Sequence, residues 1–401
     1  VGSEMCIRDS ARRNSATGEW LPAAGNLVVR CDSSTALNPG DRAVVRGKIY
    51  PFTARHGGYG RLMTRRGYVG TLYLNRSSLL LSDTLHRELS PKHLSLFLHE
   101  RAVARLDRLA LAPDEQALCN AMTAGDRRSL SPALRAAYSR SGTSHLLAVS
   151  GLHVGIVFLL ANLLLWWLPL FRHGHILRNI AVILLIWLYA ATTGFPPSVV
   201  RAALMFSVLQ FALASSSEYV GMNTLAGVAF VMLLFHPDYL FDISFQLSFI
   251  AVAGIIAWGL PLCRLLRTRR KSIDMLTATL AIGFSASAAT APLISHTFGQ
   301  ISVVGLALNP VVILLSYVVV GSCTLWLVIP GTALAPLFSV VAGFAARAQN
   351  ELIRAAAALP AAALDIRLTT TQCWSVYGLF IFATLLLWSA ERKKSVSSLP
   401  E

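Results

Sequence analysis

The sequence is poor in charged residues and lacks the short motifs of the common soluble enzymes. Only 14% of its 401 residues are Asp, Glu, Lys or Arg, against about 25% in an average soluble domain. It contains no Walker A loop, no H-E-x-x-H and no G-x-S-x-G. These absences argue against an ATP-driven motor, a zinc protease and an α/β-hydrolase. The sequence therefore does not predict a simple soluble enzyme.

Cysteine is also scarce, and its spacing predicts no metal site. No two cysteines form C-x-x-C, and no zinc-ribbon spacing occurs, so we expect no metal and no other cofactor. The alternative is a disulfide between Cys31 and Cys119, which would require that this region face an oxidising compartment. The cysteines are Cys6, Cys31, Cys119, Cys263, Cys323 and Cys373.

Long apolar runs dominate the second half of the chain. Hydrophobic residues make up 54% of the sequence, and several runs between about residues 145 and 390 reach the roughly 20 residues that span a bilayer. They are longer than the alternating ten-residue strands of outer-membrane barrels. We therefore predict an α-helical polytopic membrane protein with about nine spans. These lie near 150–170, 179–194, 198–215, 221–236, 239–263, 273–296, 301–329, 332–347 and 371–390.

The region before the apolar runs has a different pattern. Short apolar or alternating stretches, such as 27–31, 43–50 and 68–74, are separated by glycine turns. This pattern is typical of a small β-barrel of the OB type. Residues 1–17 start at Val1 and resemble unrelated leading sequence, so we expect them to be an artefact or disordered, with the true N-terminus missing.

The predicted domain order follows from these patterns. The OB-like β domain covers residues 18–80, a soluble helical region covers 81–143, the polytopic membrane domain covers 144–394, and a tail covers 395–401. Residues 348–366 are expected to form an Ala-rich helix at the membrane interface.

The distribution of basic residues predicts the orientation in the membrane. With nine spans and a cytoplasmic C-terminus, the inner loops hold most of the basic residues near the spans, as the positive-inside rule requires. Arg135 and Arg140 oppose this assignment, because they lie close to the first span on the outer side. The β domain would then be extracytoplasmic. The net charge of +15 would suit contact with nucleic acid or anionic lipid.

The segment SGTSHLLAVSGLHVG at 141–155 concentrates small and polar residues at the mouth of the first span. Ser150 and His153 lie three residues apart, on one face of a helix, and could act as nucleophile and base. His145 and His153 would point about 80° apart, which is poor for one metal ion. The third interpretation is a helix-packing contact through Gly151-x-x-x-Gly155.

Further polar residues fall within or beside the apolar runs. Arg201 and Asp242 lie near the starts of two spans, where an ion pair between them would offset the cost of burying each charge; snorkelling to the interface is the alternative. Gln246 continues a polar stripe from Asp242. Pro310, next to Asn309, is expected to interrupt its span beside a water-filled path.

Basic and aromatic residues alternate in the predicted β domain. Such a surface can stack the bases of a single strand and follow its phosphates, although core aromatics with solvated arginines would give the same pattern. The candidate single-strand-binding residues are Tyr50, Arg55, Tyr59, Arg61, Arg65 and Arg66.

Five segments together resemble a known family, the ComEC-type competence proteins. The most specific is GTSHLLAVSGLHVGIV at 142–157. The others are AGDRRSL (124–130), TGFPPSVVRAALM (193–205), HPDYLFDISFQLSFIAVAGI (236–255) and HTFGQISVVGLALNP (296–310).

The resemblance implies an inner-membrane channel that carries single-stranded DNA into the cytoplasm during natural transformation. It also implies membrane lipid, a DNA receptor and a cytoplasmic helicase or nuclease as partners. The chain departs from the family in lacking the leading helices and the metallo-β-lactamase-like domain, so strand degradation is not expected from it. The residues expected to line or support the path are Ser144, His145, Ser150, Gly151, His153, Arg201, Asp242, Gln246 and Asn309.

Two other functions remain open at this point. An intramembrane hydrolase would use Ser150 and His153, whereas a small-anion transporter would use the same cationic lining without DNA. We expect a channel and not an enzyme, with no catalytic residue.

Overall fold

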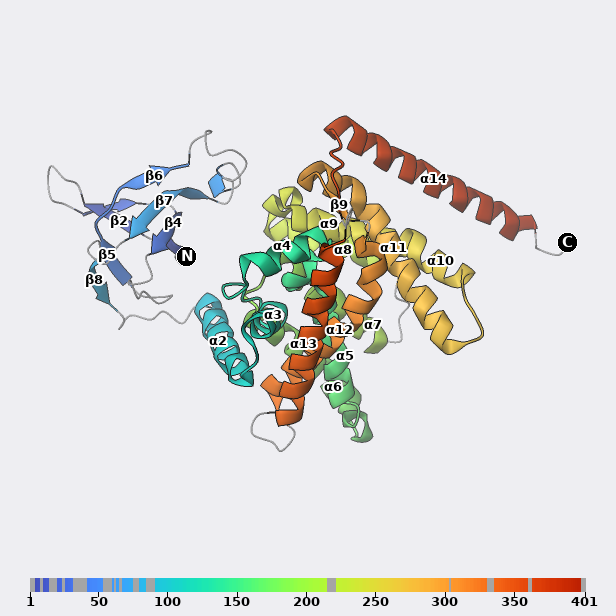
Figure 1. Ribbon diagram of the computed structural model, residues 1–401, viewed down its shortest axis with the longest axis horizontal. Coiled ribbons are helices and arrows are strands. Elements are labelled where there is room, and N and C mark those ends of the chain that lie inside the picture. Colours follow the sequence, from blue (N-terminus) through green and yellow to red (C-terminus); the bar gives the residue numbers. More distant parts are fainter. Residues whose placement is uncertain are drawn as a thin grey trace. The chain divides into compact units, whose positions relative to one another are not determined.

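The computed structural model separates the chain into two compact units, residues 1–97 and 98–401. Figure 1 shows strands in the first unit and helices in the second. The structure describes residues 4–7, 10–13, 20–23, 26–31, 42–52, 60, 63–64, 67–74, 79–83, 91–214, 221–302, 304–329, 335–359 and 363–397.

The first unit is built on a four-stranded mixed sheet with the order β1-β4-β7-β6. Its central strands β4 and β7 run parallel, while β1 and β6 pair antiparallel at the two sides. Two further antiparallel pairs, β2–β3 and β5–β8, complete the described strands. The strands are β1 (Glu4–Ile7), β2 (Ser10–Arg13), β3 (Trp20–Ala23), β4 (Asn26–Cys31), β5 (Arg42–Val45), β6 (Ile49–Pro51), β7 (Tyr68–Leu74) and β8 (Leu79–Asp83).

The described strands do not by themselves establish the OB-like barrel over residues 18–80, which stays a prediction. The described strands fall into separate sheets, and their ladders do not close into a barrel. Within residues 1–17, β1 pairs with β4 in the register Met5↔Val29 and Cys6↔Val28, and the expectation that this segment is an artefact or disordered stays a prediction. Strand alternation can be read from sequence, but the strand that pairs with a given edge is set by contacts between distant residues.

The first unit has a small apolar core formed by Val29, Leu72 and Leu74, with Val45 packed against it. Along β7 the even-numbered positions from Gly70 to Leu74 face this core, and Tyr73 faces outward. Gly70 is required here, because a Cβ would lie 2.5 Å from the carbonyl oxygen of Tyr50. The sheet therefore has one packed face and one face that carries exposed side chains.

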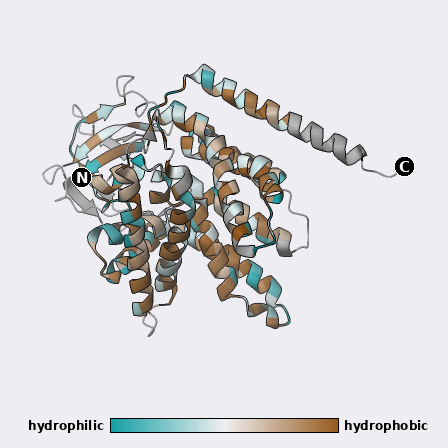
Figure 2. Cartoon of the chain, turned by 45° about the vertical axis from the view of Figure 1, so that its right-hand side comes forward, coloured by the Kyte–Doolittle hydropathy of each residue, from teal (hydrophilic) through white to brown (hydrophobic). Residues whose placement is uncertain are grey.

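The second unit is helical, and five of its described segments are long and apolar enough to cross a membrane. This agrees with the predicted polytopic membrane protein. The five are 151–170, 174–192, 243–265, 273–298 and 308–328. Figure 2 shows hydrophobic residues along these helices. Two more predicted spans form shorter apolar helices, α7 (Pro197–Ala214) and α8 (Gly221–Phe235).

The remaining elements of this unit follow in chain order. They are α2 (Pro91–Leu106), which begins in the first unit and ends in the second, η3 (Asp107–Leu109), α3 (Pro113–Thr123), α4 (Pro132–Arg140), η4 (Ser144–Leu147), α5 (Gly151–Leu164), η5 (Leu168–Leu170), α6 (Gly174–Thr192), η6 (Pro237–Phe241), α9 (Ile243–Gly254), η7 (Ile255–Gly259), α10 (Leu260–Leu265), α11 (Lys271–Phe298), β9 (Ile301–Ser302), α12 (Val304–Val328), α13 (Ala335–Ala357), β10 (Ala363–Leu364) and α14 (Thr370–Ser397).

Helix α13 joins two segments that the sequence analysis separated. A span at 332–347 and an interface helix at 348–366 were expected, but one helix continues through residue 347. Its buried face carries Ala346, Gln349 and Ile353, and small residues allow close approach to α12. Helices α3 and α4 belong to the same core as α12 and α13. Part of the predicted soluble helical region is thus integral to the helical unit.

Two prolines modify long helices without ending them. Helix α12 is continuous from Val304 to Val328 with Pro310 inside it, so the expected interruption at 309–310 is absent from this described helix. Pro310 is the seventh residue of α12, past the four N-terminal N–H groups that need no intrahelical partner, so it removes one hydrogen bond from the helix without ending it. Pro261 follows the π-helical turn η7, a common adjustment where the regular ladder is disturbed.

A glycine contact between α9 and α11 gives a test of this packing. A Cβ at Gly254 would lie 2.5 Å from Ala289 Cβ and 3.0 Å from the Ser285 carbonyl oxygen, whereas nothing lies within 4 Å of a Cβ at Gly283. Gly254→Ala should lower the melting temperature in detergent, because overpacking costs about 1–3 kcal/mol. Gly283→Ala is the matched control and should preserve or raise it. Equal effects of the two substitutions would contradict the described α9–α11 contact.

Candidate functional site

The exposed face of the first unit carries a row of two tyrosines flanked by two basic side chains. Tyr50 on β6 and Tyr73 on β7 pack edge-to-face with ring centroids 5.8 Å apart. Lys48 lies over Tyr50 at 5.8 Å, and Arg30 on β4 lies over Tyr73 at 6.0 Å. The strand order β4-β7-β6 places these residues side by side.

The rings in this row are accessible, since Tyr50 is 49% exposed and Tyr73 is 53% exposed. A ring that is half exposed on a sheet face can stack a planar ligand, and the adjacent cations favour an anionic one. We call Arg30, Tyr73, Tyr50 and Lys48 the aromatic row. It has the chemistry of a platform for single-stranded nucleic acid.

Only part of the predicted single-strand-binding set lies within the described residues. Tyr50 is in the aromatic row, whereas Arg55, Tyr59, Arg61, Arg65 and Arg66 lie outside the described residues. Sequence reasoning missed Arg30. The alternation around residues 44–50 placed Lys48 and Tyr50 on one face, but no local pattern brings β4 beside β7.

In the second unit, Ser150 and His153 form the N-terminal cap of α5. The backbone N–H of Ser150 donates to His153 Nδ1 at 2.9 Å, and Ser150 Oγ lies 3.3 Å from the same nitrogen. His153 is fully buried. Because its Nδ1 accepts a backbone hydrogen bond, the ring proton is assigned to Nε2.

This cap differs in geometry from a nucleophile with an activated base. His153 Nε2 is buried and has no hydrogen-bond partner among the described residues. A catalytic histidine normally has its second nitrogen oriented by a third group. The contacts of Ser150 and His153 instead satisfy backbone groups at a helix start, as a capping box does.

The glycines that follow the cap bring α5 close to α7. A Cβ at Gly151 would lie 3.6 Å from Ala202 Cβ, and one at Gly155 would lie 3.2 Å from the Phe206 ring. Ser198 Oγ at the start of α7 donates to the carbonyl oxygen of Val149 at 2.8 Å. The G-x-x-x-G interpretation thus has direct contacts in the structure.

Three of the family-like segments meet at this end of the helices. Gly125 adopts φ +85°, and a Cβ there would lie 3.2 Å from Val149 Cγ2 and 3.8 Å from the Thr193 carbonyl oxygen. Gly194 and Phe195 also have positive φ, 84° and 53°, and such a value is uncommon for phenylalanine. The turns from 124–130, 142–157 and 193–205 therefore form one cluster, which we call the three-turn cluster.

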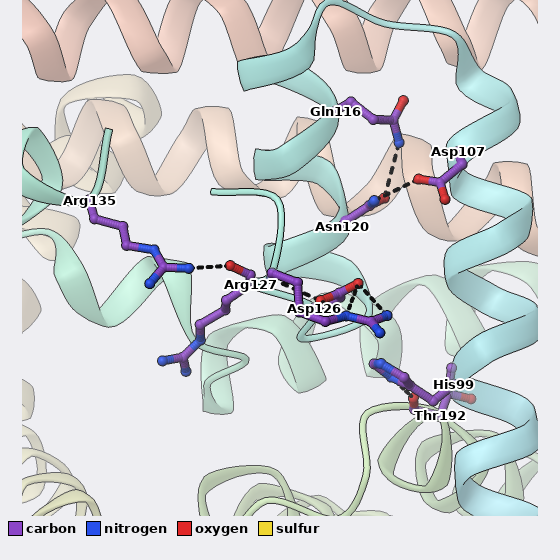
Figure 3. Close-up of polar contacts among 9 residues, drawn as sticks. His99, Asp107, Gln116, Asn120, Asp126, Arg127, Arg135 and Thr192 are labelled. Atoms are coloured by element: carbon purple, nitrogen blue, oxygen red, sulfur yellow. Dashed lines mark hydrogen bonds and ion pairs between the residues drawn. The ribbon is translucent and has the colours of Figure 1, made fainter. Parts of the chain in front are cut away.

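A charged network lies on the 124–130 turn (Figure 3). Asp126 is buried and pairs with Arg128 at 2.9 Å. Burial raises the pKa of the Asp126 carboxyl, but hydrogen bonds and charge from Arg128 outweigh burial and hold that pKa below its ordinary value. Arg135 donates to the carbonyl oxygen of Arg127. In Figure 3 the side chain of Arg127 extends away from Asp126.

The Arg127 guanidinium has no ion-pair partner in the part of the chain that the structure describes. Partial desolvation, and then repulsion by Arg135, lower its pKa. Two neighbouring guanidinium groups without a carboxylate between them favour an anion, and phosphate fits this geometry well. The network thus places basic groups beside the three-turn cluster.

The charge of Asp242 acts on the buried Arg201 guanidinium, and the predicted ion pair between these two residues stays a prediction. Arg201 is 3% exposed, its guanidinium lies 5.4 Å from the Phe249 ring centroid, and its Nη1 has no hydrogen-bond partner in the described structure. Asp242 caps α9 by accepting from the backbone N–H groups of Ser244 and Phe245 at 2.8 and 3.3 Å. Asp242 thus caps the start of α9 and also acts electrostatically on Arg201.

The other predicted path residues lie on separate elements. Gln246 Nε2 donates to the Leu240 carbonyl oxygen at 2.8 Å. Asn309 lies on α12, and its Oδ1 is buried without a partner among the described residues. Ser144 and His145 lie in η4 and are exposed.

The cysteines form no metal site within the described residues, which contain no group of three potential ligands. Cys119 is buried on α3 beside Cys323 on α12, and a hydrogen bond to Cys323 followed by burial raises the pKa of the Cys119 thiol. The neighbour of Cys119 in the structure is thus Cys323, whereas the sequence analysis considered a disulfide between Cys119 and Cys31.

Comparisons with known proteins bear on the helical unit. Residues 122–393 match the family described as Competence protein, which is more than half of the chain. A stretch of 204 residues is 33% identical to ComE operon protein 3 of Bacillus subtilis (strain 168), and 201 residues are 29% identical to an uncharacterized protein of Aquifex aeolicus (strain VF5).

Each of these alignments covers 50% of this chain, but only 24% of the Bacillus protein and 45% of the Aquifex protein. The chain thus spans less than half the length of both relatives. No solved structure matches it significantly.

The Asp126–Arg128 pair makes a pH-dependent contribution to stability that can be measured. The pKa of Asp126 is lower in the folded protein than its ordinary value of 3.8, so the ionised carboxylate stabilises the folded state. This stabilisation is fully present above pH 3.8 and is lost as the pH falls below that value. Asp126→Asn should therefore lower the melting temperature at neutral pH, and the gap to the parent protein should close below pH 3.8. A gap that does not narrow at all as the pH is lowered from neutral through the acid range in which the parent protein stays folded would contradict the assignment, since the stabilisation requires the ionised carboxylate.

Proposed function

This chain belongs to the competence protein family, and we propose that it forms a membrane channel for single-stranded DNA during natural transformation. Membership of the family supports a role in DNA uptake. The proposal adds that the DNA is single-stranded and that it passes through a membrane channel. The observation that carries it is the aromatic row, in which two exposed tyrosines are flanked by Lys48 and Arg30. An exposed row of rings and cations is suited to unpaired bases and their phosphates, independent of sequence.

The helical unit supplies the membrane part of the proposal. Its apolar helices are long enough to cross a bilayer, and the three-turn cluster gathers basic groups at one end of α5 and α7. Arg127 and Arg135 would contact phosphates at the entrance, since guanidinium groups bind phosphate oxygens strongly. His153, Arg201 and Asn309 retain buried polar atoms without described partners, which supports a role beside a polar path.

The remaining features of the proposal follow from the same assignment. The protein would lie in the bacterial inner membrane, with the first unit outside and the C-terminus in the cytoplasm. It would act as a channel and not as an enzyme, with DNA delivered by a receptor and pulled by a cytoplasmic helicase or degraded by a nuclease. Cationic lining would select the polyanionic strand, as charged rings do in other pores.

The channel proposal can be tested in cells. The gene that encodes this chain would replace the corresponding channel gene of a transformable bacterium, and labelled DNA protected from external nuclease would be measured in the cytosol. The host's own channel and a membrane-expression blot serve as controls. Protected cytosolic DNA would support the proposal. No entry at normal membrane levels, even with the source organism's own partners supplied, would contradict it.

Ser150→Ala separates the channel from the alternative hydrolase. The substitution keeps the backbone hydrogen bond to His153 and removes only the hydroxyl, so DNA uptake should stay within about threefold of the parent, consistent with loss of a weak contact. A hydrolase that used Ser150 as nucleophile would lose essentially all activity. Loss of uptake with normal membrane levels and normal melting temperature would favour the hydrolase.

The aromatic row gives a second prediction, on binding. Tyr50→Leu and Tyr73→Leu should each weaken the binding of single-stranded oligonucleotides to the purified protein by about tenfold, because stacking on one ring contributes about 1–3 kcal/mol per base. Tyr50→Phe and Tyr73→Phe are the matched controls, since they keep the ring and should preserve affinity. Fluorescence anisotropy at fixed salt would measure both. Unchanged affinity in the leucine variants would remove the row from DNA binding.

A further inference from the structure

An open groove of about 290 Å³ lies where helix α10 turns into helix α11. Both helices belong to segments long enough to cross a membrane, 243–265 and 273–298. The groove therefore opens at the end of two membrane-spanning helices. Its lining residues are Leu260, Cys263, Arg264, Arg267, Asp274 and Ala278.

The polar side of this groove carries a marked excess of positive charge. Arg264 and Arg267 line it, and Arg269 and Arg270 follow in the same connection. No acidic side chain in the described part of the chain forms an ion pair with any of these four. The one lining carboxylate, Asp274, accepts a hydrogen bond from the backbone N–H of Thr268 at 3.0 Å. Asp274 thus shapes the turn while the guanidinium groups stay available to an anion.

Leu260 belongs to the lining, and α10, α11 and their neighbouring residues carry further exposed apolar side chains close to the groove in sequence. Leu260 is 45% exposed, Leu265 80%, Ile273 43% and Met275 71%. Cys263 and Ala278 add small apolar surface to the lining, with the Cys263 thiol donating weakly to the Ala278 carbonyl oxygen at 3.6 Å. A ligand that fills the groove would therefore meet guanidinium groups at one end and hydrocarbon at the other.

We propose that this groove binds the phosphate of an anionic phospholipid, with the acyl chains lying along the exposed apolar side chains of α10 and α11. Arginine recognises phosphate through paired N–H donors, and basic pockets between membrane helices bind acidic head groups. The groove volume of about 290 Å³ lies near the lower limit of about 300 Å³ for pockets that hold drug-sized ligands. A groove of this size suits one lipid head group. Free phosphate or DNA would use the arginines but would leave the apolar side without a partner.

Bound lipid would tie the α10–α11 connection to the membrane surface. The four arginines between residues 264 and 270 have no ion-pair partner among the described residues. Like charges this near in sequence repel one another, and a lipid phosphate would reduce that repulsion. The inference is independent of the channel proposal, since it concerns only the α10–α11 connection.

The test compares two double variants that remove the same charge from the same connection. Arg264→Gln/Arg267→Gln alters the groove lining, while Arg269→Gln/Arg270→Gln is the matched control outside the lining. The full chain would be purified in mild detergent and titrated with phosphatidylglycerol or phosphatidylcholine, and bound lipid would be counted by native mass spectrometry. We expect one phosphatidylglycerol to bind at least tenfold more tightly than phosphatidylcholine. This preference should be lost in the groove variant and kept in the control variant.

Three outcomes would overturn the inference. Equal loss in both double variants would mean diffuse attraction to the whole basic connection. Displacement of phosphatidylglycerol by inorganic phosphate at equal concentration would mean a phosphate site without lipid recognition. Displacement by a single-stranded oligonucleotide would mean a nucleic-acid contact. Melting temperatures of the two variants without lipid, measured in parallel, would separate loss of binding from loss of fold.

Discussion

The close contact of three turns at one end of the helical unit is the constraint on which the candidate site depends. A Cβ at Gly125 would crowd the Val149 side chain at 3.2 Å and would lie in van der Waals contact with the Thr193 carbonyl oxygen at 3.8 Å. The contact fixes where α5 begins and, through Ser198 and Val149, where α7 begins. The positions of His153, Arg201 and the 124–130 turn follow from it. A backbone that needs positive φ at Gly125 and Phe195 is held only when its surroundings determine it, as is common at functional sites.

Polar groups buried in this apolar unit divide into satisfied and unsatisfied ones. Asp242 and Gln246 are engaged with backbone groups around the start of α9, and Asp126 is paired with Arg128. Arg201 Nη1, His153 Nε2 and Asn309 Oδ1 have no partners among the described residues. A buried polar atom without a partner costs about 1–3 kcal/mol or more. Such a cost is most readily understood if these atoms meet water or a passing ligand, which is why we connect them with transport.

Much of the helical unit could be predicted from the sequence, because hydrophobic run length determines which helices can span a membrane. The segments around 150–170 and 239–263 were predicted within a few residues. The ends of α13 could not be predicted, because its alanine face packs against α12 and α3, whose residues are distant in sequence. Pro310 was also misjudged, because the loss of one hydrogen bond does not end a long helix that is packed in a core.

The candidate site was predictable only where the pattern is local. The Ser150–His153 spacing and the Gly151–Gly155 contact could be read from one turn of helix. Whether Arg201 and Asp242 form a pair could not be read from the sequence, because it depends on how α7 and α9 pack against each other. The aromatic row needed the β4-β7-β6 order, since Arg30 and Tyr73 are distant in sequence. Alternation indicates which face a residue occupies, and pairing decides its neighbours.

The most direct test of the account is passage of a single strand through the purified protein. The protein would be reconstituted in sealed vesicles, and a fluorescent single-stranded oligonucleotide would be added outside with an inside-positive potential. We predict that protein-containing vesicles accumulate nuclease-protected strand, while empty vesicles and vesicles given an equal concentration of duplex do not. Retention of the strand outside by correctly inserted protein that still binds it would contradict conduction and leave only a binding role.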